Sequence, residues 1–338
     1  MTDISLSRSS LSTGDSAATP SDLAVGVDIG GTKISAGIVT ASGKVLRYEE
    51  RPLLNVLDES STTTIVDELV LALLQDYPDV SGIGIGCAGL VEWPSGVVRY
   101  AANSSYRGYL IRDHVERRTG MRTVIDNDGN VAAWAEYCVG AAKGHPIVVA
   151  LTVGTGIGGG ACLDGQIFRG SSGLGLEIGH VVVDPKGPRC GCGNRGCLES
   201  RVSGTALARR AREAATAVGG ERLIEIAGTP ENITGEMVFA AASQGDELAV
   251  ALYDEMGFWL GIGIASLVTV FDPTIVVLGG GMMAAGELLL RPTRESLAKH
   301  VYARSNRQLP SLCPAKAGSR AGVVGAALLA FDGAHSPK

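Results

Sequence analysis

The sequence predicts an α/β protein built from two similar lobes, with a ligand cleft between them. A short apolar strand, a glycine-rich turn and a β-hairpin occur at residues 23–49 and occur again at residues 147–168. After each of these segments, predicted strands alternate with predicted helices, which is typical of layered α/β folds. Because the same order of elements occurs twice, we expect an internal duplication, and a cleft between two lobes is a natural ligand site.

The apolar pattern and the turn residues predict the individual elements in order. In the first half, short apolar runs predict strands at 23–28, 33–39, 45–49, 82–86 and 123–125. Apolar residues at helical spacing predict helices at 62–75, 107–119 and 130–140. In the second half, the same criteria predict strands at 147–153 and 274–278, and helices at 203–217, 246–270, 283–303 and 321–329.

These elements suggest where the lobes begin and end. Residues 1–22 are rich in serine and threonine and are expected to form a disordered tail. Residues 23–127 are expected to form a small lobe, completed by the C-terminal helix at 320–331. Residues 128–319 are expected to form a large lobe that carries a metal-binding loop.

Composition disfavours several classes of protein. The net charge of −6 gives no basic surface for nucleic acid. No apolar run reaches the roughly 18 residues that span a bilayer, and the longest, 258–271, contains glycine and serine, so we expect no membrane segment. The 7 cysteines suit a reducing interior better than a secreted disulfide framework. Since the N-terminus also lacks the apolar core of a signal peptide, we expect a cytoplasmic protein.

A cluster of metal-binding residue types is the most informative motif. His180, Cys190, Cys192 and Cys197 lie close together in the sequence, among glycines that allow a tight fold. Three thiolates and one imidazole complete the tetrahedron that Zn²⁺ prefers and leave no open position, so the sequence predicts a structural zinc site. The alternative is a chance group of buried cysteines. Glu177 and Glu199 bracket the cluster, and a metal there would fix their positions.

A first glycine-rich turn follows the first predicted strand. It reads DIGGTK and contributes five candidate ATP-binding residues: Asp28, Gly30, Gly31, Thr32 and Lys33. Two glycines allow consecutive backbone N–H groups to face a phosphate, and the hydroxyl and ammonium groups add further donors. The carboxylate ahead of the turn is placed to hold Mg²⁺ through water. The alternative is an ordinary hairpin.

Two further glycine-rich segments complete the predicted nucleotide site. Gly154, Thr155 and Gly156 begin a run that matches the dinucleotide fingerprint, but a strand–turn–strand follows where that fingerprint needs a helix. A phosphate-binding hairpin is therefore the preferred interpretation. Gly279, Gly280 and Gly281 join a buried strand to a helix and suit close approach of an adenosine, with a plain β–α turn as the alternative.

Asp128 is the candidate catalytic base. It follows a predicted strand and precedes a helix, so its carboxylate is placed to accept a proton from a hydroxyl that attacks phosphorus. The alternative is that Asp126 or Asp128 only caps the helix. The other polar candidates for binding sugar hydroxyls are Asn103, Asn127, Glu177, His180 and Glu199.

Together these motifs closely resemble the ROK family (repressor, open reading frame, kinase) and, within it, the bacterial glucokinases. The matching segments are DIGGTKI at 28–34, NDGN at 127–130, LTVGTGIGGG at 151–160, EIGH with CGCGNRGCLE at 177–199, and VVLGGG at 276–281. The resemblance covers about residues 23–331. One departure is the segment after Asn103, where family glucokinases commonly have Gly-Trp and this chain has no tryptophan.

The resemblance implies an actin-like/hexokinase (ribonuclease H-like) fold with ATP and sugar in the cleft, and a homodimer or homotetramer. It implies that Asn103, Asn127, Asp128, Glu177, His180 and Glu199 face the sugar, with Asp128 as the catalytic residue and His180 binding zinc through one nitrogen. The expected partners are glucose and ATP with Mg²⁺, with no nucleic acid and no membrane.

The function expected on these grounds is ATP-dependent phosphorylation of glucose at the 6-hydroxyl, giving glucose 6-phosphate. A ROK kinase for N-acetylmannosamine, fructose, mannose or allose is the alternative, and polyphosphate is an alternative donor. A sugar-responsive repressor is disfavoured because the predicted tail shows no helix-turn-helix pattern. An actin-like or chaperone-like ATPase would have no use for the glutamates beside the metal cluster.

Overall fold

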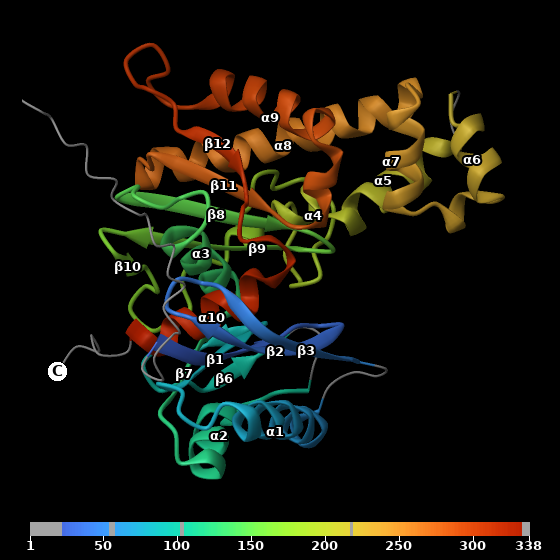
Figure 1. Ribbon diagram of the computed structural model, residues 1–338. Coiled ribbons are helices and arrows are strands. Elements are labelled where there is room, and N and C mark those ends of the chain that lie inside the picture. The colour runs from blue at the N-terminus through green and yellow to red at the C-terminus, as the bar shows by residue number, and fades with distance from the viewer. Residues whose placement is uncertain (1–21, 54–57, 102–104, 217–218, 333–338) are drawn as a thin grey trace, which may run out of the picture.

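The computed structural model describes residues 22–53, 58–101, 105–216 and 219–332. Two five-stranded sheets form separate layers, and helices lie between them and on both outer sides (Figure 1). The expected tail therefore lies, except for Asp22, outside the described residues. The layered arrangement agrees with the predicted α/β class.

The first sheet has the strand order β3-β2-β1-β4-β7. Its strands are β1 (Leu23–Ile29), β2 (Lys33–Thr40), β3 (Val45–Pro52), β4 (Ile83–Cys87) and β7 (Thr123–Asn127). The first three strands pair antiparallel, whereas β1, β4 and β7 run parallel, so their carboxyl ends meet at one edge. α1 (Glu59–Asp76) and α2 (Ile111–Thr119) lie on the outer side of this sheet.

The second sheet repeats this plan with the order β10-β9-β8-β11-β12. Its strands are β8 (Ile147–Val153), β9 (Ile157–Leu163), β10 (Gln166–Ile167), β11 (Ile275–Gly279) and β12 (Ser311–Pro314). Again three strands form antiparallel hairpins and two further strands add in parallel. The predicted duplication is therefore confirmed.

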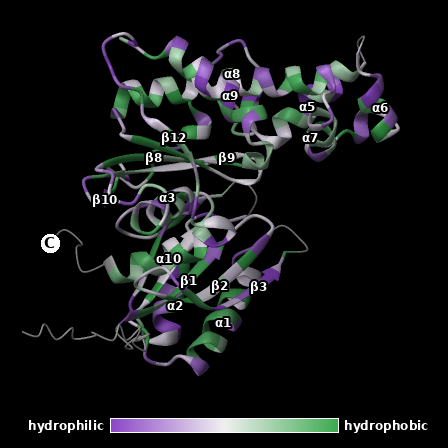
Figure 2. Cartoon of the chain, turned by 45° about the horizontal axis from the view of Figure 1, so that its top comes forward, coloured by the Kyte–Doolittle hydropathy of each residue, from purple (hydrophilic) through white to green (hydrophobic). Residues whose placement is uncertain are grey.

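Two helices fill the space between the sheets. α3 (Asp128–Cys138) contacts β8 and β9 of the second sheet, and α10 (Ala321–Asp332) contacts β1, β4 and α3. The chain thus returns to the first sheet through α10. Close approach requires glycine: a Cβ at Gly84 in β4 would overlap the carbonyl oxygen of Ala326 in α10. Figure 2 shows the apolar character of these central layers.

The remaining helices lie on the far side of the second sheet. They are α4 (Glu199–Val202), α5 (Gly204–Ala215), α6 (Glu221–Ala227), α7 (Gly235–Ser243), α8 (Glu247–Phe271) and α9 (Glu287–His300). α8 is long and apolar enough to cross a membrane by length and composition alone, which the sequence analysis did not expect. However, 56% of its most apolar window is buried, and it packs against α9, α5 and α7. We interpret α8 as a core helix of this lobe.

Several element boundaries differ from those predicted. α1 begins at Glu59 because the side chain of Asp58 accepts a hydrogen bond from the backbone N–H of Ser61. α2 begins only at Ile111. The helix expected at 283–303 is divided at Gly286, which has a φ of 52°, into a short 3₁₀ helix, η4 (Gly281–Ala285), and α9. Residue spacing alone did not reveal this break.

The structure also contains short elements that were not predicted. They are the strands β5 (Leu90–Val91), β6 (Val98–Tyr100) and β12, the helices α4, α6 and α7, and the 3₁₀ helices η2 (Ile178–His180), η3 (Pro230–Asn232) and η5 (Gly318–Arg320). Apart from α7, each is too short to show a clear period in its apolar residues.

Candidate active site

The parallel strands of the first sheet bring two carboxylates to one edge. Asp28 lies near the end of β1, and Asp128 follows directly after β7. Burial and the nearby charge of Asp128 raise the pKa of Asp28 to about 6, with a smaller opposing effect from Lys33. The charge of Asp128 is thus part of the electrostatic environment of Asp28. Such a pair suits a site that binds a cation and moves a proton.

Asp128 sits at the first position of α3. Its Oδ1 accepts hydrogen bonds from the backbone N–H of Gly129 at 2.9 Å and from Asn127 Nδ2 at 3.1 Å. Burial raises the pKa of Asp128, and these hydrogen bonds oppose the rise. A carboxylate with a raised pKa is a better proton acceptor at neutral pH than an ordinary surface aspartate.

The helix cap is neither Asp126 nor Asp128, so that alternative interpretation of the sequence was wrong. Asn127 caps α3, since its Oδ1 accepts from the backbone N–H groups of Gly129 at 2.8 Å and Asn130 at 3.2 Å. Its Nδ2 donates to the carbonyl oxygen of Gly89 at 2.9 Å. Asn127 therefore orients Asp128 and leaves it free of the capping role.

Glu177 lies in the segment that leads from β10 to the metal cluster. It precedes η2, after Leu176, which adopts a positive φ of 63°. Burial raises the pKa of Glu177, the charge of His180 lowers it, and the charges of Asp128 and Glu199 raise it. Residues far apart in the sequence therefore contribute to the electrostatic environment of Glu177.

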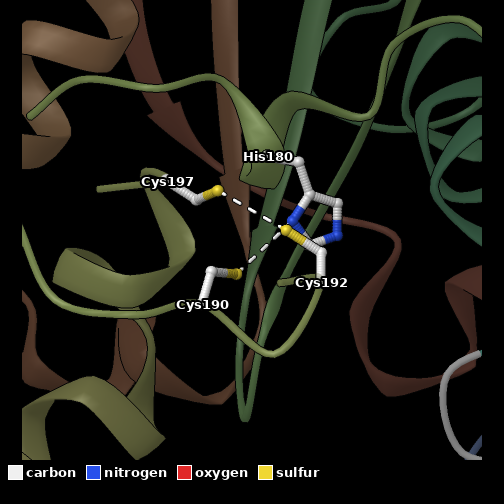
Figure 3. A group of neighbouring side chains, drawn as sticks. All are labelled: His180, Cys190, Cys192 and Cys197. Carbon is white, nitrogen blue, oxygen red and sulfur yellow. Dashed lines mark hydrogen bonds between the residues drawn. The ribbon is translucent and has the colours of Figure 1, made fainter. Parts of the chain in front are cut away.

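The predicted metal ligands come together. The ligand atoms of His180, Cys190, Cys192 and Cys197 all lie within 4.8 Å of one another. The Sγ atoms of Cys192 and Cys197 are 3.7 Å apart, and Cys190 Sγ lies 3.7 Å from His180 Nδ1 (Figure 3). A zinc tetrahedron with bonds of about 2.3 Å has edges of about 3.7 Å, so the donor set and spacing fit Zn²⁺. The other imidazole nitrogen points away from the sulfurs.

Glu199 links this cluster to the second glycine loop. Its Oε2 accepts a hydrogen bond from the backbone N–H of Ile157 at 2.9 Å, and its Oε1 lies 3.7 Å from Cys190 Sγ. A Cβ on Gly156 would overlap the same carboxylate, which explains the glycine there. A residue predicted to bind sugar thus also holds the loop predicted to bind phosphate.

The second glycine segment bonds to the start of α5, and the third packs against the end of β8. Gly204 donates its backbone N–H to the carbonyl oxygen of Gly154 at 2.8 Å, and the Thr205 hydroxyl donates to that of Thr155 at 2.9 Å. Gly280 has a φ of 90° and lies so close to Val153 that a Cβ there would overlap its carbonyl oxygen. The strand β9, not a helix, follows Gly156, so the dinucleotide fingerprint is excluded.

The first glycine loop is a tight turn, in which Gly30 donates its backbone N–H to the carbonyl oxygen of Lys33 at 3.1 Å. Gly31 and Thr32 are exposed. The Lys33 ammonium group pairs with Glu50 at 2.6 Å and donates to the Tyr48 hydroxyl at 3.3 Å, so β3 holds it in this conformation. A role for Lys33 in binding phosphate stays a prediction.

Asn103, predicted to bind sugar, lies outside the described residues. Just after it, the ring of Tyr106 is 1% exposed and packs on that of Tyr109, with 4.9 Å between the centroids. The hydroxyl groups of Tyr106 and Tyr109 bond to Thr62 and Thr63 of α1. The two tyrosines are therefore held against α1.

The sequence analysis missed Arg169, which lies just beyond β10. It forms an ion pair with Asp126 at 2.6 Å, and its guanidinium carbon lies 3.9 Å from the centre of the Trp93 ring. No local motif predicts this contact, because its partners are far away in the sequence. Asp126 was considered only as a helix cap.

Two duplicated α/β lobes, with carboxylates and glycine loops gathered from both, define the class of two-lobed kinases with the actin-like/hexokinase fold. The ROK family model matches residues 24–332, and the chain belongs to the ROK family.

Individual relatives agree with this assignment. A glucokinase of Streptomyces coelicolor is 38% identical over 92% of this chain and 98% of its own length. A glucokinase of Thermotoga maritima is 37% identical over 82% of this chain and 87% of its own length. A solved ROK glucokinase from Streptomyces griseus, in complex with glucose and AMPPNP, is 38% identical, with a TM-score of 0.81 over 92% of this chain and 99% of its own length.

Proposed function

We propose that this chain is a glucokinase, which transfers the γ-phosphoryl group of ATP to the 6-hydroxyl of glucose. The observation that best supports this is the shared environment of Asp28, Asp128 and Glu177, which come from both lobes. The relatives at 37% and 38% identity are glucokinases, so neither a repressor nor a kinase for another hexose is favoured.

In this proposal Asp128 accepts the proton of the 6-hydroxyl as that oxygen attacks the γ-phosphorus. The raised pKa of Asp128 favours proton uptake, and the cap formed by Asn127 holds its carboxylate in place. Glu177 and the free nitrogen of His180 bind sugar hydroxyls, together with Asn103, Asn127 and Glu199. Hydrogen bonds from several fixed groups orient the reacting hydroxyl.

The nucleotide would lie against the glycine loops. The backbone N–H groups of residues 30–32 and 154–156 would bind phosphate oxygens, and Gly279, Gly280 and Gly281 would lie against the adenosine. Asp28 would hold Mg²⁺ through water, and Mg²⁺ would neutralise charge on the transferring phosphoryl group. At neutral pH Asp28 is mostly ionised even with a pKa of about 6, as a cation ligand must be.

The cluster of His180, Cys190, Cys192 and Cys197 would hold one structural Zn²⁺. Its four protein ligands leave no position for substrate, so its effect on catalysis would pass through Glu177, His180 and Glu199.

We also propose a cytoplasmic homodimer or homotetramer with no nucleic-acid or membrane partner. Its small lobe would comprise residues 23–127 with the helix at 320–331, and its large lobe residues 128–319. The position of α10 against β1 and β4 supports placing that helix in the small lobe.

One panel of assays tests the proposed function. Purified protein is given glucose, mannose, fructose, allose or N-acetylmannosamine, with either ATP or polyphosphate, and release of product is followed. We expect the highest kcat/KM with glucose and ATP. Higher kcat/KM with another sugar or with polyphosphate would overturn the proposed substrate or donor, and no turnover with any pair would overturn the kinase assignment.

A further inference from the structure

A buried ion pair joins the two sheets next to Asp128. Asp126, in β7 of the first sheet, is 2% exposed, and the side chain of Arg169, just after β10 of the second sheet, is 16% exposed. Arg169 Nε donates to Asp126 Oδ2 at 2.6 Å. A charge pair that is so shielded from water breaks only at a high free-energy cost, because one partner would be left buried without a counter-charge.

On the side of the first sheet, hydrogen bonds connect this ion pair to the proposed catalytic carboxylate of Asp128. Asp126 Oδ1 accepts from the backbone N–H of Asn127 at 2.8 Å and from Asn130 Nδ2 at 2.9 Å. Asn127 in turn donates from Nδ2 to Asp128 Oδ1 at 3.1 Å. A continuous series of hydrogen bonds therefore runs from the guanidinium group to Asp128.

On the other side, the pair anchors the loop that ends at Glu177. The Arg169 guanidinium carbon lies 3.9 Å from the centre of the Trp93 ring, a cation–π contact with the first lobe. The backbone N–H of Trp93 donates to the carbonyl oxygen of Ser172 at 2.9 Å. Gly173 lies so close to Val91 and Trp93 that a Cβ would overlap them. The first residues of the loop are thus fixed to the lobe of the first sheet, whose strand β7 directly precedes Asp128.

We infer that Arg169 is a positioning residue for phosphoryl transfer, which sets the sugar-binding loop of residues 169–177 in register with Asp128. This inference rests on the proposed function. Glu177 would bind the sugar and Asp128 would take its proton, so the distance between these groups decides whether the hydroxyl is aligned. A misplacement of about 1 Å is enough to lower the rate by about 10²-fold.

The test compares four variants with the wild-type protein. Arg169→Gln removes the charge and leaves Asp126 buried and unpaired. Arg169→Gln with Asp126→Asn removes both charges, so no buried charge is left without a counter-charge. Arg169→Lys keeps the charge but not the planar group that stacks on Trp93. Arg307→Gln is a control for losing a shielded arginine away from the site: the Arg307 side chain is 17% exposed and pairs with Asp272, which is 79% exposed and lies before β11, at the opposite strand ends from the glycine loops.

We expect Arg169→Gln to lower both the melting temperature and kcat, and the double variant to regain the melting temperature while its kcat stays at least tenfold below wild type. KM for ATP should change less than twofold in the double variant, whereas KM for glucose should rise several-fold. Arg169→Lys should recover part of kcat. Arg307→Gln should leave kcat unchanged, and should lower the melting temperature less than Arg169→Gln does, because Asp272 stays in contact with water.

Recovery of kcat together with stability in the double variant would show that the pair only balances charge, and would overturn the inference. Equal rises in KM for ATP and glucose would also count against it. A wild-type protein inactive with every hexose would overturn the proposed function and this inference with it. An active wild type with an unaffected Arg169→Gln variant would overturn the inference alone.

Discussion

At the scale of single residues, Asp128 has hydrogen bonds that orient it but no ion pair among the described residues. Asn127 performs the capping that sequence analysis considered for Asp126 or Asp128, so the carboxylate of Asp128 can accept a proton. The predicted catalytic role of Asp128 is therefore distinct from the helix-capping role, which belongs to Asn127.

Asp128→Asn should retain the fold and glucose affinity and lose turnover. The substitution is nearly isosteric and keeps an oxygen for the N–H of Gly129, so only the proton acceptor is lost. Loss of a general base typically lowers the rate by about 10²–10⁴-fold. Steady-state kinetics and glucose calorimetry measure both effects; a kcat above about a tenth of the wild-type value would exclude Asp128 as the base.

Asp28 should make stability depend on pH. The pKa of Asp28 is about 6 in the folded chain, above its ordinary value of 3.8, so the folded state binds more protons between these values. Stability therefore falls as pH rises through that window, by roughly 3 kcal/mol in total. Asp28→Asn should raise the melting temperature at pH 8 but not at pH 3.5, while lowering activity.

Thermal unfolding of both proteins between pH 3.5 and 8 checks this expectation. An equal change in melting temperature at every pH would show that ionisation of Asp28 does not lower the free energy of unfolding. In the wild type, activity should also fall below about pH 6, as Asp28 becomes protonated and loses the charge that would attract Mg²⁺.

At the scale of elements, the metal loop and α4 act as one unit. Glu199 begins α4 and contacts both Cys190 and the backbone N–H of Ile157 in the second glycine loop. Glu177, in contrast, directly precedes η2, which carries the proposed ligand His180. A disturbed loop would therefore move groups on the sugar side and the phosphate side together.

Cys192→Ala should lower the zinc content and depress glucose binding, with a smaller loss of ATP binding through Glu199. Cys192 is the exposed member of the cluster, so the substitution would remove one of the proposed zinc bonds with little loss of core packing. Added Mg²⁺ should not restore activity, because hard cations do not favour thiolates. Elemental analysis decides the assignment: a fully active wild-type preparation with less than about half an equivalent of zinc per chain would contradict it.

At the scale of the whole molecule, α10 connects the lobes. It packs on β1 and β4 of the first sheet and on α3, which in turn packs on the second sheet. Glycines in the strands allow the helix to approach their backbone, as at Gly26 and Gly84. The relative position of the lobes thus depends on a close contact between helix and sheet.

Gly84→Ala should destabilise the whole chain. Its Cβ would overlap the backbone of Ala326, which cannot rotate away as a side chain could, and overpacking typically costs about 1–3 kcal/mol or more. Gly235→Ala is the control, because its nearest neighbour would be an ordinary contact at 3.7 Å from the carbonyl oxygen of Gly204. Denaturant unfolding measures both; similar stability of the two variants would refute the packing argument.

The sequence by itself determined the features that depend on neighbours along the chain. The duplicated hairpins, the strand ends that carry Asp28 and Asp128, and the cluster from His180 to Cys197 were all predicted, because short-range spacing encodes them. The end of α2 was also predicted, since Gly120 adopts the left-handed conformation that glycine favours.

The tertiary structure decided what depends on distant partners. It paired Arg169 with Asp126, bound Lys33 to Glu50, and placed Glu199 against Ile157. Only the structure shows that Asn127, and neither neighbouring aspartate, caps the helix. The carboxylate of Asp126 instead accepts hydrogen bonds from Arg169 and Asn130. The contacts of Arg169, Lys33 and Glu199 join residues that are far apart in the sequence, so the spacing of residues along the chain does not predict them.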